Sequence, residues 1–215
     1  MVKDKKIFLD YGGLICDYQF NRRTLFRAHR LALDYLNSQN GHRISLDRLS
    51  QAHDKTIQAY LQARNRNNSE WTMDKIMEMI LSDLGLNGNV HLSRVSDIYK
   101  YNDHDSEPYP DTERVLSELS KRRKLGIISN LPHDSEIEEL RAFGLIDHFD
   151  SITLSYQVGF RKPHPAIYQE ALRSAGVTPE QSFFISHDQE ETEGAEKLGI
   201  ESLLVKSIKE VIGAV

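Results

Sequence analysis

The segment Lys6-Ile7-Phe8-Leu9-Asp10-Tyr11-Gly12-Gly13 is the most informative place to begin with this chain. Its consecutive apolar residues, 7 to 9, predict a short buried strand, because the glycines that follow would break a helix. Asp10 therefore stands at the carboxyl end of a strand. In an open parallel sheet, ligands bind at this end of the strands, so Asp10 is the first candidate functional residue.

The residues that follow this strand in the sequence form two segments with different hydrophobic patterns. From about residue 20 to residue 101, apolar residues recur at helical spacing without a β-rich run, and 37–41 and 102–108 are rich in turn residues. After Pro110, predicted helices alternate with short apolar strands near 125–128, 151–154, 183–185 and 202–205. This alternation predicts an α/β fold with a Rossmann-like parallel sheet. We expect a core domain of residues 1–16 and 103–215 and an inserted α-helical domain of residues 17–102.

The composition is that of an ordinary globular protein. The chain has 215 residues, 39% of them hydrophobic, with a net charge of −5 and a single cysteine, Cys16. One cysteine cannot form an internal disulfide or a cysteine-rich zinc site, and the negative charge disfavours nucleic acid and anionic membranes as partners. The chain has neither an apolar run of membrane-spanning length nor an apolar leader at its N-terminus. We expect a cytoplasmic protein, monomeric or homodimeric, without nucleic-acid or membrane partners.

Polar residues follow each predicted strand. Asp10 follows the first, and Ser129-Asn130 the second. Arg161-Lys162 comes after the third, and Ser186-His187-Asp188, with Glu190 and Glu191 just beyond, ends the fourth. A carboxylate, a hydroxyl, a lysine and an acidic cluster at one rim suit attack on an anionic group. Each also has an ordinary structural explanation, as a turn residue, a helix entry or a partner of a helix dipole. The ordered set at strand ends favours the functional interpretation.

The ordered set resembles the four motifs of the haloacid dehalogenase (HAD) hydrolase superfamily. The third motif, Gly159-Phe160-Arg161-Lys162-Pro163, is the most specific. The matching stretches are residues 7–14, 125–130, 158–168 and 183–188, the last followed by 193–195 and 198–199. The helical insertion resembles the C1 cap of that superfamily. The resemblance extends over the whole chain and implies a HAD fold.

The resemblance also implies roles. Asp10 is expected to be the nucleophile, Ser129 to bind a phosphate oxygen and Lys162 to neutralise the transferring group. The expected catalytic residues are Asp10, Ser129, Asn130, Lys162 and His187, and the expected substrate contacts are Tyr11, Gly12, Gly13, Ser129 and Arg161. Mg²⁺, which prefers oxygen ligands, would be held by Asp10, the Gly12 carbonyl, Asp188 and Glu191. The implied function is a phosphatase that acts on a small phosphomonoester through an aspartyl-phosphate on Asp10.

Two departures from the resemblance bear on the chemistry. Gly12 stands where phosphatases of the superfamily usually carry a second Asp, which protonates the leaving alcohol, although some members, including sugar-phosphate phosphatases, also have Gly there. We therefore hypothesise a substrate with a weakly basic leaving group, such as an anomeric sugar phosphate, an aryl phosphate or an acyl phosphate. In addition, His187 stands where the metal-binding members carry an Asp, and imidazole is a poor Mg²⁺ ligand. Asp188, Glu190 or Glu191 could take over, and His187 could serve as a general acid or base or only as a loop residue.

Two alternative functions stay open. The first is a metal-independent 2-haloacid dehalogenase. Such enzymes carry a Ser-Ser-Asn-x-x-Asp pattern where this chain has residues 186–191, which are of the same length and similar polarity, and a tyrosine that Tyr168 matches. Against them stand Gly12 and Leu14, and no arginine is singled out for the halide among Arg22, Arg23, Arg27 and Arg30. The other alternative is a catalytically weak binding or regulatory protein. Retention of Asp10, Ser129 and Lys162 argues against that alternative.

Overall fold

The computed structural model describes residues 4–40, 43–86 and 91–214. The chain forms two compact units, one of residues Met1–Tyr18 and Ser106–Val215, the other of Gln19–Asp105. We call them the α/β unit and the helical unit. No helix within the described ranges has the length and apolar character that a membrane span needs.

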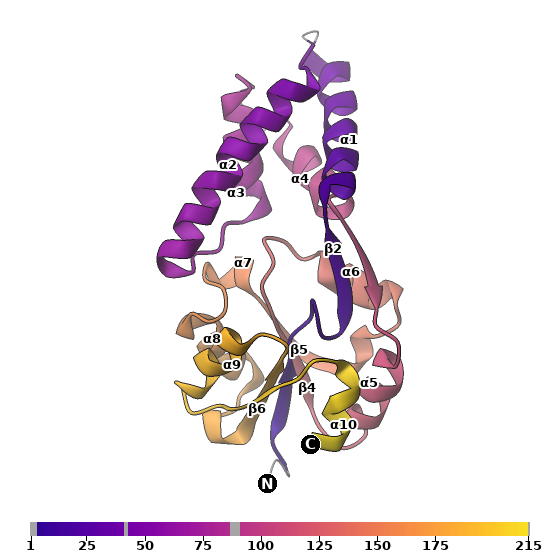
Figure 1. Ribbon diagram of the computed structural model, residues 1–215, viewed down its shortest axis with the longest axis vertical. Helices are drawn as coiled ribbons and strands as arrows, with labels where there is room; N and C mark the ends of the chain where they lie inside the picture. Colours follow the sequence, from indigo (N-terminus) through magenta and orange to yellow (C-terminus); the bar gives the residue numbers. More distant parts are fainter. Residues whose placement is uncertain (1–3, 41–42, 87–90, 215) are drawn as a thin grey trace. The chain divides into compact units, whose positions relative to one another are not determined.

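The α/β unit is built on a five-stranded parallel sheet in the order β5-β4-β1-β6-β7 (Figure 1). The strands are β1 (Lys6–Leu9), β4 (Leu125–Ser129), β5 (Phe149–Leu154), β6 (Ser182–Ser186) and β7 (Glu201–Leu204). β1 is central, and its Leu9 lies opposite Ile127 of β4 and Ile185 of β6. This register brings the carboxyl ends of β1, β4 and β6 to one edge of the sheet. It confirms the predicted fold class.

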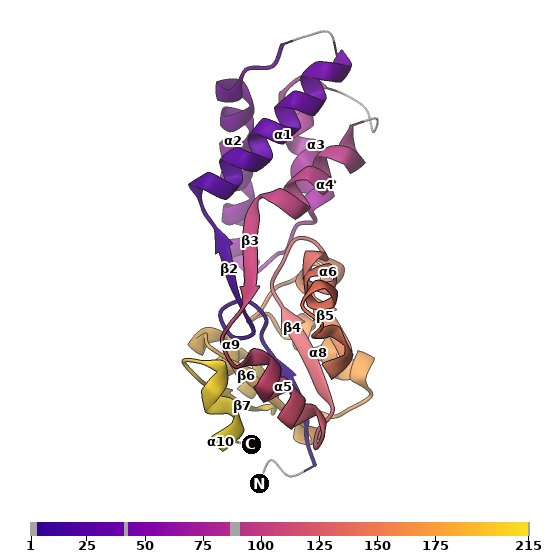
Figure 2. The same cartoon turned by 90° about the vertical axis from the view of Figure 1, so that its right-hand side faces the viewer.

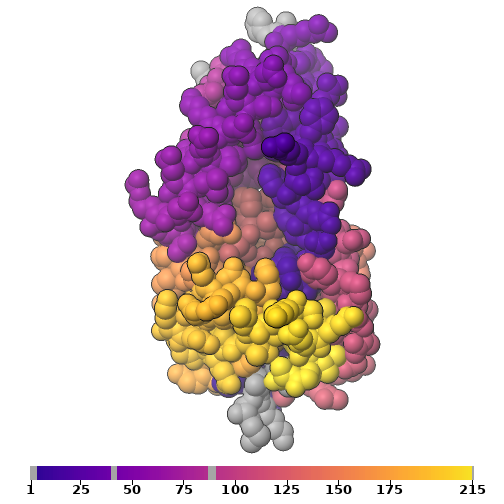
Figure 3. Space-filling view, in the orientation of Figure 1, coloured from indigo at the N-terminus to yellow at the C-terminus, as the bar shows by residue number. Residues whose placement is uncertain are grey.

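Helices cover both faces of this sheet because successive side chains of a strand point to opposite sides. Ile7 and Leu9 pack with α5 (Thr112–Ser120), α6 (Ser135–Ala142) and α10 (Val211–Ala214). Phe8 packs on the other face with α8 (Pro165–Ala175) and α9 (Gln189–Glu196). The short helices of the unit are α7 (Ser155–Val158) and the 3₁₀ turns η1 (Ile146–His148), η2 (Pro179–Gln181) and η3 (Ile208–Glu210). Figure 3 shows the C-terminal elements, coloured toward yellow, at the surface of the unit.

The helical unit contains α1 (Arg22–Asn40), α2 (Leu46–Asn67), α3 (Met73–Asp83) and α4 (Leu92–Asn102). Two helices begin at side-chain caps: Ser45 accepts a hydrogen bond from the Arg48 amide, and Thr72 accepts one from the Lys75 amide. The helices share one apolar core, to which α3 contributes side chains at helical spacing, including Met73, Met77 and Ile80.

Two segments differ from the sequence-based expectation. The turn-rich residues 102–108 include a strand, β3 (His104–Pro108), which pairs with β2 (Cys16–Phe20) in a separate two-stranded sheet (Figure 2). The partner strands are distant in sequence, so local residue preferences gave no sign of the pair. The sequence also predicts a turn at 37–41, of which Gly41 lies outside the described residues. The helix α1 continues to Asn40, so the prediction is wrong for residues 37–40. There the Asn37 amide exchanges hydrogen bonds of 3.1 and 2.7 Å with the Ile44 backbone.

Candidate active site

A cavity of about 390 Å³ lies in the α/β unit at the carboxyl ends of β1, β4 and β6. Asp10 lines it directly after the central strand, and its amide donates a 3.0 Å hydrogen bond to the Ile185 carbonyl of β6. Ser129 and Asn130 of the β4 end, Arg161, and His187 and Asp188 after β6 line the same cavity. The structure therefore brings the predicted strand-end residues together.

Lys162 connects two buried carboxylates. Its ammonium donates to Asp10 Oδ1 at 2.5 Å and lies 2.8 Å from Glu191 Oε2. The Lys162 side chain is completely inaccessible to solvent, and Asp10 is 4% exposed. Buried charges of this kind persist only when they are paired and hydrogen-bonded. Lys162 is not among the residues that line the cavity, so its contact with the cavity runs through Asp10.

These contacts set the protonation state of the carboxylate at position 10. Burial alone would raise the pKa of Asp10, but the Lys162 ammonium and hydrogen bonds from His187 and Lys162 hold this pKa below its ordinary value. The pKa of Lys162 is raised, since the charges of Asp10 and Glu191 outweigh its burial. Burial raises the pKa of Glu191, against the effect of Lys162. Of the two carboxylates that share one cation, Asp10 is therefore the stronger acid, and it is ionised at neutral pH.

Ser186 and Asn130 complete this network. The Ser186 hydroxyl lies 2.8 Å from Glu191 Oε2 and 3.4 Å from Asp10 Oδ2. Asn130 donates to Glu191 Oε1 at 3.0 Å and accepts from the Lys162 amide at 2.7 Å. Sequence reasoning did not include Ser186 among the site residues. Its position as the last residue of β6 was the available signal.

His187 contacts the other oxygen of the candidate nucleophile. Its Nδ1 lies 2.9 Å from Asp10 Oδ2, and this hydrogen bond raises the pKa of His187 above its ordinary value. The side chain is 42% exposed, so it faces the cavity and solvent as well as Asp10. Gly13 allows the ring to approach, because its φ is +80° and a Cβ there would lie 2.5 Å from the imidazole. The imidazole is thus placed to exchange a proton with a group bound in the cavity.

Ser129 has a partner that the sequence did not reveal. Its hydroxyl donates a hydrogen bond to Oε1 of Glu136 from α6. Glu136 is fully buried, and this burial raises its pKa to about 8. The residue lies seven positions after Ser129, in a stretch of several acidic side chains. Only the packing of α6 against the end of β4 distinguishes Glu136 from its neighbours.

The remaining predicted residues have less direct positions. The Tyr11 phenol is buried and donates to Glu139 at 2.7 Å, so its hydroxyl hydrogen is already engaged within the protein. Tyr11, Gly12 and Gly13 are among the residues that line the cavity. The Asp188 carboxylate accepts hydrogen bonds from the amides of Glu190 and Glu191 at the start of α9. This is the N-cap role that Asp commonly plays.

The predicted Mg²⁺ ligands do not form a suitable set in this arrangement. Both oxygens of Asp10 already accept from Lys162 and His187, and the Glu191 carboxylate is occupied by Lys162, Ser186 and Asn130. Within residues 4–40, 43–86 and 91–214, no three carboxylate, imidazole or thiol ligand atoms of this site lie within 4.8 Å of one another. Lys162 and His187 supply the positive charge where a divalent cation is expected.

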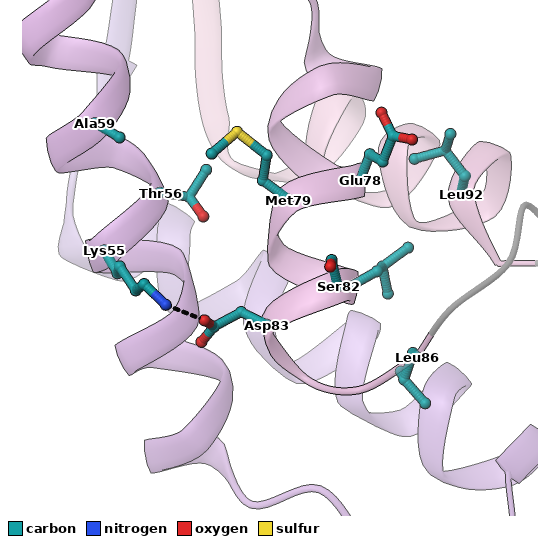
Figure 4. Close-up of a pocket in the computed structure, with 10 residues that line it drawn as sticks. Lys55, Thr56, Ala59, Glu78, Met79, Ser82, Asp83, Leu86 and Leu92 are labelled. Carbon is teal, nitrogen blue, oxygen red and sulfur yellow. Dashed lines mark hydrogen bonds and ion pairs between the residues drawn. The ribbon is translucent and has the colours of Figure 1, made fainter.

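The helical unit contains a larger cavity, of about 610 Å³, between α2 and α3 (Figure 4). Lys55 of α2 and Asp83 of α3 form an ion pair across it, and Met79 projects toward Thr56. The charged groups of this pair neutralise each other, and none of the strand-end residues lines this cavity. We therefore place the chemistry in the α/β unit.

Comparison with known proteins agrees with this fold. The profile of the family described as haloacid dehalogenase-like hydrolase matches residues 42–205. The chain belongs to this family. The matched range begins after Asp10 and includes the segments that supply Ser129, Lys162 and Glu191. This result confirms the family resemblance inferred from the motifs.

Several relatives of similar sequence are phosphatases by name. The chain is 38% identical over 102 residues to glyceraldehyde 3-phosphate phosphatase of Methanothermobacter thermautotrophicus, over 46% of this chain and 45% of the relative. It is 32% identical over 99 residues to phosphoserine phosphatase of Thermus thermophilus, over 45% and 40% of the two chains. The aligned region therefore spans less than half the length of these relatives.

Solved structures resemble the fold over nearly the whole chain. A 2-haloacid dehalogenase from Pseudomonas syringae pv. Tomato superposes with a TM-score of 0.65 at 18% identity, over 93% of this chain and 85% of the other. A HAD phosphatase from Thermococcus onnurineus superposes with a TM-score of 0.63 at 20% identity, over 98% and 97%. At these identities the likeness concerns the fold alone.

Proposed function

We propose that this protein is a hydrolase that forms a covalent ester on Asp10, and that its substrate is a small phosphomonoester. The observation that carries the proposal is the ionised Asp10 carboxylate, held by Lys162 at the edge of a cavity beside Ser129 and Arg161. A nucleophile needs to be deprotonated and correctly oriented, and its buried ammonium partner provides both conditions. The phosphatase names of the relatives support the choice of substrate.

The proposed reaction proceeds in two steps. An Asp10 oxygen attacks phosphorus, the bond to the leaving oxygen breaks, and that oxygen takes a proton from the His187 imidazolium. Water then attacks the aspartyl-phosphate, neutral His187 accepts a proton from it, and phosphate and free Asp10 are formed. Ser129 and Arg161 bind the substrate oxygens, and Lys162 offsets the negative charge near Asp10.

The absence of a carboxylate at Gly12 sharpens the substrate class. With no carboxylate at Gly12, His187 is the proton donor proposed for the leaving oxygen, and its Nδ1 is already bonded to Asp10. A leaving group that is a weak base depends least on this donor, whereas general acid catalysis is otherwise worth about 10²–10⁴-fold. We therefore propose an anomeric sugar phosphate, an aryl phosphate or an acyl phosphate. Turnover should fall steeply as the pKa of the leaving group rises, and a flat dependence across aryl and alkyl phosphates would overturn this part of the proposal.

A metal-independent 2-haloacid dehalogenase is the second candidate. It is favoured by the closed network around Lys162, in which Lys162, Ser186 and Asn130 satisfy the Glu191 carboxylate without a metal ion. Tyr168 reinforces that network, since its hydroxyl donates to the Glu191 carbonyl at 2.7 Å. In this reaction an Asp10 oxygen would attack the carbon that bears the halogen, release halide, and leave an ester for water to hydrolyse.

One experiment separates these functions. Wild-type protein and the Asp10→Asn variant are assayed with a panel of phosphate esters, with Mg²⁺ and with EDTA, and with 2-chloropropionate in EDTA. Phosphate release that Asp10→Asn abolishes supports the phosphatase, and halide release supports the dehalogenase. No turnover of any substrate contradicts both and favours a binding or regulatory role.

We also propose that the helical unit, Gln19–Asp105, serves as the cap domain of the family and sets substrate specificity. Replacing residues 19–105 with the corresponding helical insertion of a phosphatase of known specificity tests this. The chimera should take the substrate preference of the donor and keep its dependence on Asp10. An unchanged preference would place specificity in the α/β unit.

A further inference from the structure

Glu136 combines three properties that the reaction steps above do not use. It is 0% exposed, it lines the Asp10 cavity, and its Oε1 accepts a hydrogen bond from the Ser129 hydroxyl. Its second oxygen, Oε2, is buried and has no hydrogen-bond partner among the described residues. A buried carboxylate with an unpartnered oxygen is costly, whereas a neutral carboxylic acid can stay in such a place.

The surroundings of Glu136 favour its protonated form. Burial is the largest effect, and together with the charges of Asp10 and Glu139 it raises the pKa of Glu136 to about 8. The hydrogen bond from Ser129 and the charge of Lys162 lower this pKa, but by less. Cys16 is also buried, and this burial raises the pKa of its thiol to about 12, so it is neutral. Glu136 is therefore a carboxyl group that can hold its proton at neutral pH and lose it in mild alkali.

The Ser129 hydroxyl has a single hydrogen to donate. When Glu136 is ionised, its carboxylate accepts the hydrogen bond from Ser129. An anion in the cavity then faces the lone pairs of the Ser129 oxygen and the negative charge of Glu136. When Glu136 is protonated, it can donate to Ser129 Oγ, and the Ser129 hydrogen is then available to the anion. A neutral buried carboxylic acid that acts as a hydrogen-bond donor has a known precedent in enzyme sites.

We propose that Glu136 is a positioning residue that must carry a proton for Ser129 to donate its hydroxyl hydrogen to a bound anionic substrate. The proposal rests on the proposed function only in that the cavity binds an anion, and it applies equally to a phosphate and to the carboxylate of a haloacid. Binding of the substrate is then coupled to uptake of a proton by Glu136. The coupling limits substrate affinity, rather than the chemical step, at alkaline pH.

The test is calorimetric titration of the wild type and of Glu136→Gln with inorganic sulfate, which keeps one charge state between about pH 6 and about pH 10. Wild-type dissociation constants should rise about tenfold per pH unit above about pH 8, where Glu136 loses its proton. A glutamine side chain does not titrate and its NH₂ group can donate to Ser129 at every pH, so the variant should lose this component of the rise. His187 also loses positive charge as pH rises, and this weakens sulfate binding in both proteins. The effect of Glu136 is therefore the difference between the pH dependence of the wild-type dissociation constant and that of the variant.

Proton uptake gives an independent measure of the same coupling. Titrations at about pH 9 in buffers of different ionisation enthalpy should show that the wild type takes up about one proton more per bound sulfate than Glu136→Gln. The matched control is Glu139→Gln, which changes another carboxylate of α6 whose partner is Tyr11. This control should keep the wild-type proton uptake.

Several results would overturn the proposal. Equal proton uptake by wild type and Glu136→Gln is one, and absence of sulfate binding at every pH is another. If circular dichroism shows that Glu136→Gln does not fold, the pH dependence of sulfate affinity in the wild type and in Glu139→Gln tests the proposal instead. A wild-type affinity that stays constant above pH 8 would then refute it. Sulfate binding with the predicted coupling but no turnover of any ester or haloacid would instead refute the proposed function alone.

Discussion

The two units of this protein bury polar groups in opposite ways. The α/β unit encloses charges, with Lys162 between Asp10 and Glu191. The helical unit encloses neutral aromatic groups, where the His53 ring lies 4.9 Å from His29 and stacks on Tyr99 at 5.9 Å. Both clusters are almost inaccessible to solvent.

The difference between the clusters lies in their partners. Burial would raise the pKa of Asp10, but Lys162 reverses the effect and keeps the carboxylate charged. His53 has no comparable partner, since its Nδ1 lies 3.6 Å from a largely exposed Asp54, and burial lowers the pKa of His53 to about 4. Burial therefore produces a reactive ion where a counter-charge is fixed beside it, and an inert packing group where none is.

The largest expected effect is the removal of the central cation. Lys162→Met leaves two buried carboxylates without their shared ammonium, and it should reduce the free energy of unfolding by about 3–5 kcal/mol. Urea unfolding measures this change. The matched control is Lys55→Met, which breaks an exposed ion pair and should cost less than about 1 kcal/mol. Similar losses in the two variants would contradict the distinction drawn between buried and exposed pairs.

The next effect concerns the neutral cluster at acid pH. The folded-state pKa of His53 lies below the unfolded value, so the unfolded chain binds more protons and stability falls as pH drops from 6.5 toward 4. The loss should approach about 3 kcal/mol. His53→Phe, which keeps an aromatic ring beside Tyr99, should remove most of this pH dependence. Thermal unfolding followed by circular dichroism between pH 7 and pH 4 checks it, and parallel curves for the two proteins would refute it.

A third prediction adds a carboxylate to the charged cluster. A Cβ at Gly12 would lie 3.6 Å from the Tyr18 Cβ, which is an ordinary contact, so Gly12→Asp can be accommodated. An aspartate there could protonate a leaving alcohol, and kcat/KM for an alkyl phosphate should rise about 10²-fold. Gly12→Asn, which has the same shape without an ionisable proton, is the control. An equal rise in both variants would mean that the gain is not acid catalysis.

The smallest predicted effects compare one hydrogen bond in each cluster. Ser186→Ala removes a 2.8 Å bond to the Glu191 carboxylate and should destabilise the protein by about 1–3 kcal/mol. Tyr99→Phe removes a 3.4 Å contact between the hydroxyl and His29 Nδ1 and should cost about 0.5 kcal/mol or less. Denaturant titration of both variants measures the difference, and a greater loss for Tyr99→Phe would reverse the comparison.

Much of the fold followed from local patterns. The apolar run of Ile7-Phe8-Leu9, its following glycines and the alternation after Pro110 predicted the parallel sheet, and the polar residues after its strands predicted one shared edge. The β2–β3 pair was not predicted, because its strands are joined by residues from distant parts of the chain. The predicted magnesium ligand set was not supported, since the carboxylates of Asp10 and Glu191 are held by Lys162.

The sequence by itself determined which side chains reach the end of each strand, because that depends on short-range periodicity and on the breaks after each apolar run. The tertiary structure alone decided their protonation states and partners. Glu136 and Ser186 show this best: one became a buried acid behind Ser129, and the other a link between Asp10 and Glu191. Burial and fixed neighbouring charges shift a pKa, and both depend on the packing of segments that lie far apart in the chain.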